Sequence, residues 1–107
     1  MRKMVEKIFR RYGSVMTLLA ADGEEEFRGF LQHVNSRSRQ RVRAEWTVLG
    51  EVPDGVYVLI LPAGVQIVAG DRVALVQEVY MVHQLENVVY GDEVLYQWGL
   101  CVKEGGA

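Results

Sequence analysis

The stretch "VAGDRVALVQEVYMVHQLENV", residues 68–88, is typical of a chain that folds back on itself in an antiparallel sheet. A Gly-Asp pair at 70–71 predicts a turn, and the polar pair at 77–78 predicts a second turn between two apolar runs. Tyr80 and Val82 share one face of the second run, so we expect both to pack inside the domain, with the tyrosine hydroxyl at its rim. The stretch therefore predicts scaffold, with Asp71 as a turn residue.

Short strands and turns alternate in the same way on both sides of this stretch. Asp22-Gly23 predicts a hairpin within residues 14–34, and the Pro-Asp-Gly sequence at 53–55 predicts another turn. The run "VYVLIL" at 56–61 is apolar on both faces, which indicates a central strand or one covered by a helix or another subunit. Residues 94–103 alternate cleanly. About seven short strands predict a mainly β fold, a small antiparallel β-barrel or sandwich.

The N-terminus predicts one amphipathic helix of about three turns. Its apolar side holds Met4, Val5, Ile8, Phe9 and Tyr12, and its polar side holds Lys3, Glu6, Lys7, Arg10 and Arg11. Gly13 is the expected C-cap. We expect the helix to pack on the sheet, and its basic side offers a second interpretation, an arm that docks on a neighbouring subunit or an anionic surface.

Length and composition predict one domain, because the chain has 107 residues, of which 50% are hydrophobic and 24% charged. We expect a helix over 1–13, a β-barrel domain over 14–103 and a flexible tail over 104–107. The single cysteine, Cys101, fits a reducing compartment. No apolar run approaches the length of a membrane span, so we expect an intracellular soluble domain with no membrane partner. The net charge of −2 makes no general case for nucleic acid.

The sequence offers little that predicts catalysis. His33 and His83 lie fifty residues apart, each inside an expected strand, and are expected to be structural. Metal-ligand spacings, a nucleophile elbow and a P-loop are missing from the sequence. Nothing near Cys101 would lower its pKa, so we expect a buried, inert thiol. We therefore expect no enzyme, no cofactor and no catalytic or metal-binding residues.

Three carboxylates, Glu24, Glu25 and Glu26, follow the Asp22-Gly23 turn. Alternation along a strand places Glu24 and Glu26 on one side and Glu25 on the other. One interpretation is a solvated hairpin end that discourages strand pairing, and another is an acidic docking patch. A general acid/base pair would need a cleft to raise one of the pKa values.

The stretch "NSRSRQRVRAEW" departs most from the rest of the sequence. Every second residue is arginine: Arg37, Arg39, Arg41 and Arg43. Three interpretations stand: a long polar loop, a surface that pairs with acidic residues of a neighbouring subunit, and a phosphate-binding edge. Against the third, no aromatic residue lies between Phe30 and Trp46, and Trp46 falls on the opposite face from the arginines in an extended chain.

The order of these features is similar to that in a known family. A short helix and a hairpin precede a polar loop between "FLQHV" and "TVLG", and "DGVYVLILP", "GDRV", "YMV" and "LYQWGL" follow. This order resembles the small head–tail joining (head-closure) and tail-completion proteins of tailed phages and prophages. The chain departs from the family pattern at 77–78, where Gln-Glu replaces a glycine-containing turn.

The resemblance implies a barrel protomer that works as one segment of a ring at the connector or tail. Its partners would be other virion or connector proteins, with only weak, non-specific contact with DNA. It would be found in the host cytoplasm during assembly and afterwards in the virion. The resemblance implies neither enzyme activity nor a cofactor. The alternative function is a small-barrel nucleic-acid-binding module that uses the arginines at 37–43.

Overall fold

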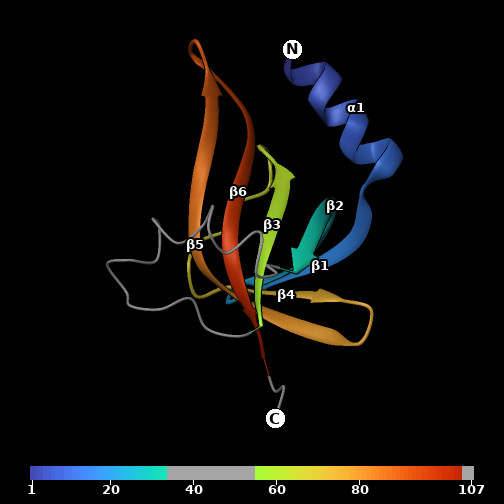
Figure 1. The fold of residues 1–107 in the computed structure, drawn as a ribbon, viewed down its shortest axis with the longest axis vertical. Coiled ribbons are helices and arrows are strands. Elements are labelled where there is room, and N and C mark those ends of the chain that lie inside the picture. Colours follow the sequence, from blue (N-terminus) through green and yellow to red (C-terminus); the bar gives the residue numbers. More distant parts are fainter. Residues whose placement is uncertain (34–54, 105–107) are drawn as a thin grey trace.

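The strands predicted from the alternating pattern form a closed antiparallel barrel with one N-terminal helix. The computed structural model describes residues 1–33 and 55–104. Within these ranges the elements are α1 (Arg2–Tyr12), β1 (Ser14–Ala20), β2 (Gly23–His33), β3 (Val56–Pro62), β4 (Arg72–Leu75), β5 (Glu78–Tyr90) and β6 (Glu93–Lys103), as Figure 1 shows. The expected mainly β class is confirmed. The further strand expected to end near Gly50 lies outside the described residues.

The strand order around the barrel is β1-β2-β3-β6-β5-β4, and β4 pairs with β1 to close it. The closing pair is short, with Thr17 opposite Ala74 and Leu18 opposite Val73. Every one of these six strands therefore has a neighbour on both sides. The sequence left a barrel and a sandwich as alternatives, and the structure is a barrel.

The barrel interior is filled by apolar side chains from all six strands and from the loop after β3. Its buried residues are Met16, Leu18, Phe27, Leu59, Leu61, Val65, Ile67, Val73, Tyr80, Val82 and Cys101. Tyr80 and Val82 pack in the interior, as their shared face predicts. Val65 and Ile67 come from the loop between β3 and β4 and lie in the same cluster. The core is thus one packed unit that includes a loop as well as the sheet.

Both faces of β3 are covered, as its sequence predicts. Leu59 and Leu61 face the interior, while Val56 lies in a second apolar cluster with Leu100 of β6, packed against Trp98. The helix α1 contacts β2, β3 and β6 from outside. Figure 1 shows α1 beside the barrel, with its N-terminus at the same end as the β5–β6 hairpin. The expected packing of the helix on the sheet is therefore confirmed.

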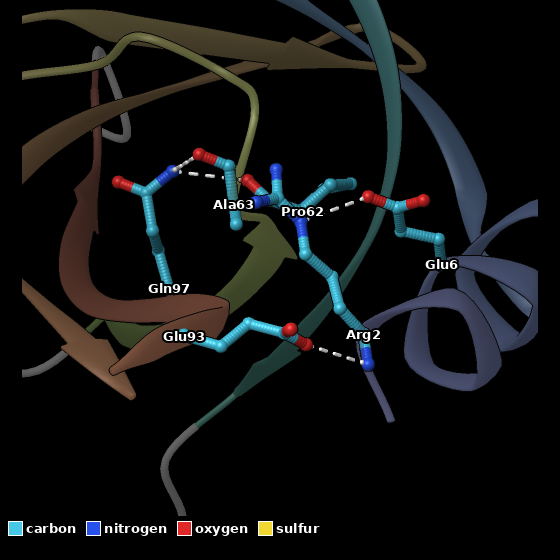
Figure 2. A network of polar contacts seen from close by, with 6 residues as sticks. All are labelled: Arg2, Glu6, Pro62, Ala63, Glu93 and Gln97. Atoms are coloured by element: carbon cyan, nitrogen blue, oxygen red, sulfur yellow. Dashed lines mark hydrogen bonds and ion pairs between the residues drawn. The ribbon is translucent and has the colours of Figure 1, made fainter. Parts of the chain in front are cut away.

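The helix is held by few contacts. Phe9 is its one buried residue in the described structure, and its ring lies 5.5 Å from that of Phe30. Arg28 Nη1 donates a hydrogen bond to the Gly13 carbonyl at 3.2 Å, and the Arg2 backbone N–H donates to Glu93 Oε1 at 2.9 Å. Figure 2 shows the second of these contacts. The helix is thus tied to the barrel at both ends, with one aromatic anchor between them.

The turn between β4 and β5 lies one residue earlier than expected. Leu75 pairs with Glu78, so Val76 and Gln77 form a two-residue turn in place of the expected Gln77-Glu78 turn. Val76 has a φ of 57°, a conformation that costs a β-branched residue about 1–3 kcal/mol. Its side chain is 92% exposed. The Gly-Asp turn at 70–71 forms as predicted, with Asp71 Oδ2 accepting a hydrogen bond from Val68 N.

Gly99 of β6 allows a close approach of β5. A Cβ at this position would collide with the backbone oxygen of Gln84 and lie 2.8 Å from Leu85 Cδ2. The register of β5 against β6 shifts between Val82 and Gln84, which indicates a β-bulge directly beside this contact. The glycine therefore lets the bulged strand pack against β6 without displacing its backbone.

We predict that Gly99→Ala lowers the free energy of unfolding by about 1–3 kcal/mol, because the obstacle is backbone rather than a flexible side chain. Denaturant unfolding of the two proteins measures the difference. Gly64→Ala is the matched control, because a Cβ at 64 would meet nothing within 4 Å. Equal effects of the two substitutions would contradict the close approach.

Candidate interaction surfaces

The three predicted carboxylates lie at the start of β2 and are all exposed. Glu25 pairs with Leu18, whose side chain is in the barrel interior, while Glu24 pairs with Leu19 and Glu26 with Thr17. Directly opposed residues of an antiparallel pair share a face. Glu25 is therefore on the interior side at the end of the barrel, and Glu24 and Glu26 are on the outer side, as alternation predicts.

Asp22 in the turn adds a fourth exposed carboxylate. We call Asp22, Glu24, Glu25 and Glu26 the acidic hairpin. Between Ala20 and Phe27 the sequence contains no cation, so this end of the β1–β2 pair carries concentrated negative charge. The four predicted arginines, Arg37, Arg39, Arg41 and Arg43, lie outside the described residues, so their three interpretations remain as the sequence leaves them.

The helix exposes a second surface. Met1, Met4, Ile8 and Tyr12, which we call the α1 stripe, have exposed fractions of 64%, 67%, 46% and 65%. At 3.6 residues per turn they lie within about 80° of the helix circumference. Beside the stripe lie the exposed residues Lys3, Lys7, Arg10 and Arg11, which we call the basic sector. The sequence predicts an apolar side of α1, but the barrel covers only the edge of it that contains Phe9.

A shallow hollow of about 590 Å³ opens beside the acidic hairpin. Ala20 and Ala21 line it on one side, Val65, Ile67 and Val68 on another, with Asp22, Gln66, Asp71 and Gln97 completing the lining. Its surface is thus largely apolar with two carboxylates, Asp22 and Asp71. The hollow combines the end of β1 with the loop after β3, two segments that are far apart in sequence.

Gln97 holds that loop in place. Its side-chain amide donates hydrogen bonds to the carbonyls of Pro62 at 2.9 Å and Val65 at 2.8 Å, with a longer contact to Ala63 at 3.5 Å. Figure 2 shows the amide directed toward Pro62 and Ala63. Gln97 is not among the residues that the sequence predicts to be functional. Its signal was a polar residue on the same face of the last strand as Leu95 and Cys101, both buried.

Cys101 and Tyr80 lie in the apolar core, and His33 packs against an aromatic ring. Cys101 is fully buried, and burial raises the pKa of its thiol to about 12. Burial also raises the pKa of Tyr80, with a smaller contribution from Tyr57. The ring of His33 lies 5.0 Å from that of Tyr57, in an edge-on arrangement. Within residues 1–33 and 55–104 no group of three or more His, Cys, Asp or Glu side chains is placed to hold a metal ion.

The same ranges contain no helix with the length and apolar character needed to cross a bilayer.

We predict that Gln97→Met lowers the free energy of unfolding by about 1–3 kcal/mol, because the Pro62 and Val65 carbonyls lose their buried donor. Denaturant unfolding measures the loss, and faster hydrogen exchange in residues 63–68 locates it. Gln66→Met in the same loop is exposed and should change stability by less than about 0.5 kcal/mol. A Gln97 variant as stable as the Gln66 variant contradicts the anchoring role.

We predict that Cys101 reacts slowly with thiol reagents at pH 8 in the folded chain and rapidly after unfolding, because burial suppresses its thiolate. Its folded pKa of about 12 lies above the ordinary value of 9.0. The part of the folding stability that depends on a neutral Cys101 thiol is therefore complete below pH 9. It is lost as the pH rises toward 12, by up to about 1.4 kcal/mol per pH unit. Cys101→Ala should lack this part of the alkaline destabilisation. If the free energy of unfolding falls equally with rising pH in the wild type and in Cys101→Ala, the buried thiol is not the cause.

Comparisons of the chain with protein-family models, with curated proteins and with solved structures give no match. The features that bear on function are the two surfaces, the hollow beside the acidic hairpin and the order of features in the sequence.

Proposed function

We propose that this chain is a structural or assembly protein of a tailed-phage or prophage particle, a protomer of the head–tail connector or of the completed tail. In this role it acts through protein–protein contacts and carries out no catalysis. It assembles in the host cytoplasm and becomes part of the virion. Its partners are other virion proteins, including further copies of itself in a ring.

The observation that carries the proposal is an exposed apolar surface on a barrel whose described strands are all paired. The α1 stripe leaves Met4 and Tyr12 about two-thirds exposed, although the helix is anchored to the barrel. Contiguous apolar exposure of this kind marks interaction sites in soluble proteins. Each of the six described strands already has a neighbour on both sides, which favours side-chain surfaces such as the α1 stripe as the places where partners bind.

Two further observations support the assembly role. The acidic hairpin and the basic sector of α1 are different surfaces of opposite charge on the same chain, as ring formation by one kind of subunit requires. The order of helix, hairpin, polar loop and strands also resembles that of head–tail joining and tail-completion proteins, and a closed barrel with an N-terminal helix agrees with what that resemblance implies.

Deleting the gene from the phage or prophage that encodes the chain tests the proposal. We predict DNA-filled heads and separate tails that fail to join, seen by electron microscopy, together with a loss of infectious titre that the wild-type gene restores in trans. The chain itself should be found in purified wild-type particles. Normal particles and an unchanged titre would contradict the proposal, as would a gene with no phage morphogenesis genes beside it.

Titration with DNA at several salt concentrations separates this function from the nucleic-acid alternative. A connector protomer should bind weakly and with little dependence on salt. A binding module that uses Arg37, Arg39, Arg41 and Arg43 should show a log–log slope of several units, about one for each phosphate contact. A steep slope that falls when these arginines are replaced would favour the alternative.

A further inference from the structure

The α1 stripe contains four large apolar residues, whereas the barrel buries one residue of the helix, Phe9. Phe9 is 3% exposed, whereas the four stripe residues are between 46% and 67% exposed. Each turn of α1 therefore presents one large apolar side chain to solvent, at positions 4, 8 and 12. A helix with these anchors at intervals of four residues is suited to lie in a groove on another surface.

The charge around the stripe restricts what can cover it. Residues 2–12 contain five cations, Arg2, Lys3, Lys7, Arg10 and Arg11, and one carboxylate, Glu6. Glu6 forms an ion pair with Arg2 at 3.1 Å, so the other four cations give the outer face of the helix its positive charge. Arg11 also lies over the ring of Tyr12, 5.5 Å from its centroid, which joins the basic sector to the stripe. The complementary surface is apolar with carboxylates beside it.

The chain itself presents such a surface. The hollow beside the acidic hairpin is lined by Ala20, Ala21 and Val68, with Asp22 and Asp71 among its lining residues. Asp22 leads directly into the three glutamates at the start of β2, with Glu25 on the interior side and Glu24 and Glu26 on the outer side. Val68 is 65% exposed, so apolar area is also available at the rim. The carboxylates that line the hollow and follow it on β2 are thus opposite in sign to the four outer cations of α1.

The helix cannot reach this surface on its own chain. β1 begins directly after α1, and its register places Ser14 opposite Gly29 at the helix end and Ala20 opposite Gly23 at the far end. These two ends are separated by about 20 Å of strand. On β2 the helix contacts the region of Phe30, away from the acidic hairpin. The two complementary surfaces therefore meet only between two molecules.

We propose that α1 of one copy docks on the acidic hairpin and hollow of a second copy, with the α1 stripe in the hollow and the basic sector against the carboxylates. Because the two surfaces differ, the contact is head-to-tail: the first copy keeps its acidic hairpin and hollow free, and the second copy keeps its α1 stripe free. Repetition of this contact builds a ring or a filament. The inference deepens the proposed assembly function and rests on it in taking the chain to work as one of several copies.

Sedimentation of the full-length chain at increasing concentration tests the interface. We expect the wild-type chain to form oligomers that weaken between about 0.1 and 0.5 M NaCl, since salt screens exposed charges. Ile8→Glu in the stripe and Glu24→Lys/Glu26→Lys in the acidic hairpin should each weaken association by about tenfold or more. Val76→Glu on the β4–β5 turn also places a glutamate at an exposed apolar residue, which is 92% exposed against 46% for Ile8, and it should associate like the wild type.

Mixing the two defective proteins gives the sharpest result. The hairpin variant retains an intact helix, and the Ile8 variant retains an intact acidic hairpin, so the mixture should form heterodimers that do not extend further. Circular dichroism and thermal unfolding confirm that each variant is folded. A symmetric helix-to-helix contact would instead leave the mixture without heterodimers, which would overturn the head-to-tail arrangement.

Three other results would overturn the proposal. A wild-type chain that stays monomeric at about 1 mM lacks the interface at any useful affinity. Loss of assembly on Arg39→Glu/Arg41→Glu, with normal assembly of the Ile8 variant, would assign the basic surface to the arginine stretch. Binding of the wild type, but not of the Ile8 variant, to anionic vesicles without self-association would assign the stripe to a membrane. None of these results depends on whether the chain is found in a virion.

Discussion

Pairing of β1 with β4 is the constraint on which the rest of the described structure depends. These hydrogen bonds join Leu18 to Val73 across a long stretch of sequence and turn an open sheet into a barrel. Closure encloses the apolar core and gives each of the six described strands a neighbour on both sides. The helix, hairpins and loops are consequently the parts that remain for recognition, and the exposed charge and apolar area are found on α1 and the β1–β2 pair.

Local sequence patterns predict most of the strands, because alternation and turn residues act within a few positions. The strand expected over 94–103 is where its alternation places it, within β6, and the hairpin expected at Asp22-Gly23 forms one residue earlier, with Ala21 and Asp22 between the paired Ala20 and Gly23. The turn before Glu78 is shifted by one residue because cross-strand pairing sets its register, and valine occupies a position that glycine would prefer. Closure itself is not predictable in this way, since no local pattern determines which distant strands pair.

The candidate surfaces were predicted unevenly. Alternation places Glu25 apart from Glu24 and Glu26 correctly, because the face of a strand residue depends only on its position. The helix pattern identifies an apolar side but cannot tell which edge of it faces the barrel, and the contact of Phe9 with Phe30 decides this. The role of Gln97 is not predictable from its neighbours in sequence, because its amide donates hydrogen bonds to the carbonyls of Pro62 and Val65, some thirty residues earlier.

The surface against which α1 packs is formed by β2, β3 and β6, which are synthesised at different times. The helix precedes the six described strands along the chain, so it is synthesised before them, and β6 is synthesised after the other five. Until β6 pairs with β3, only part of the surface that α1 contacts is present. Closure of the barrel by pairing of distant strands is also slow compared with formation of a helix. The helix can therefore complete its contacts with the barrel only after β6 has been synthesised.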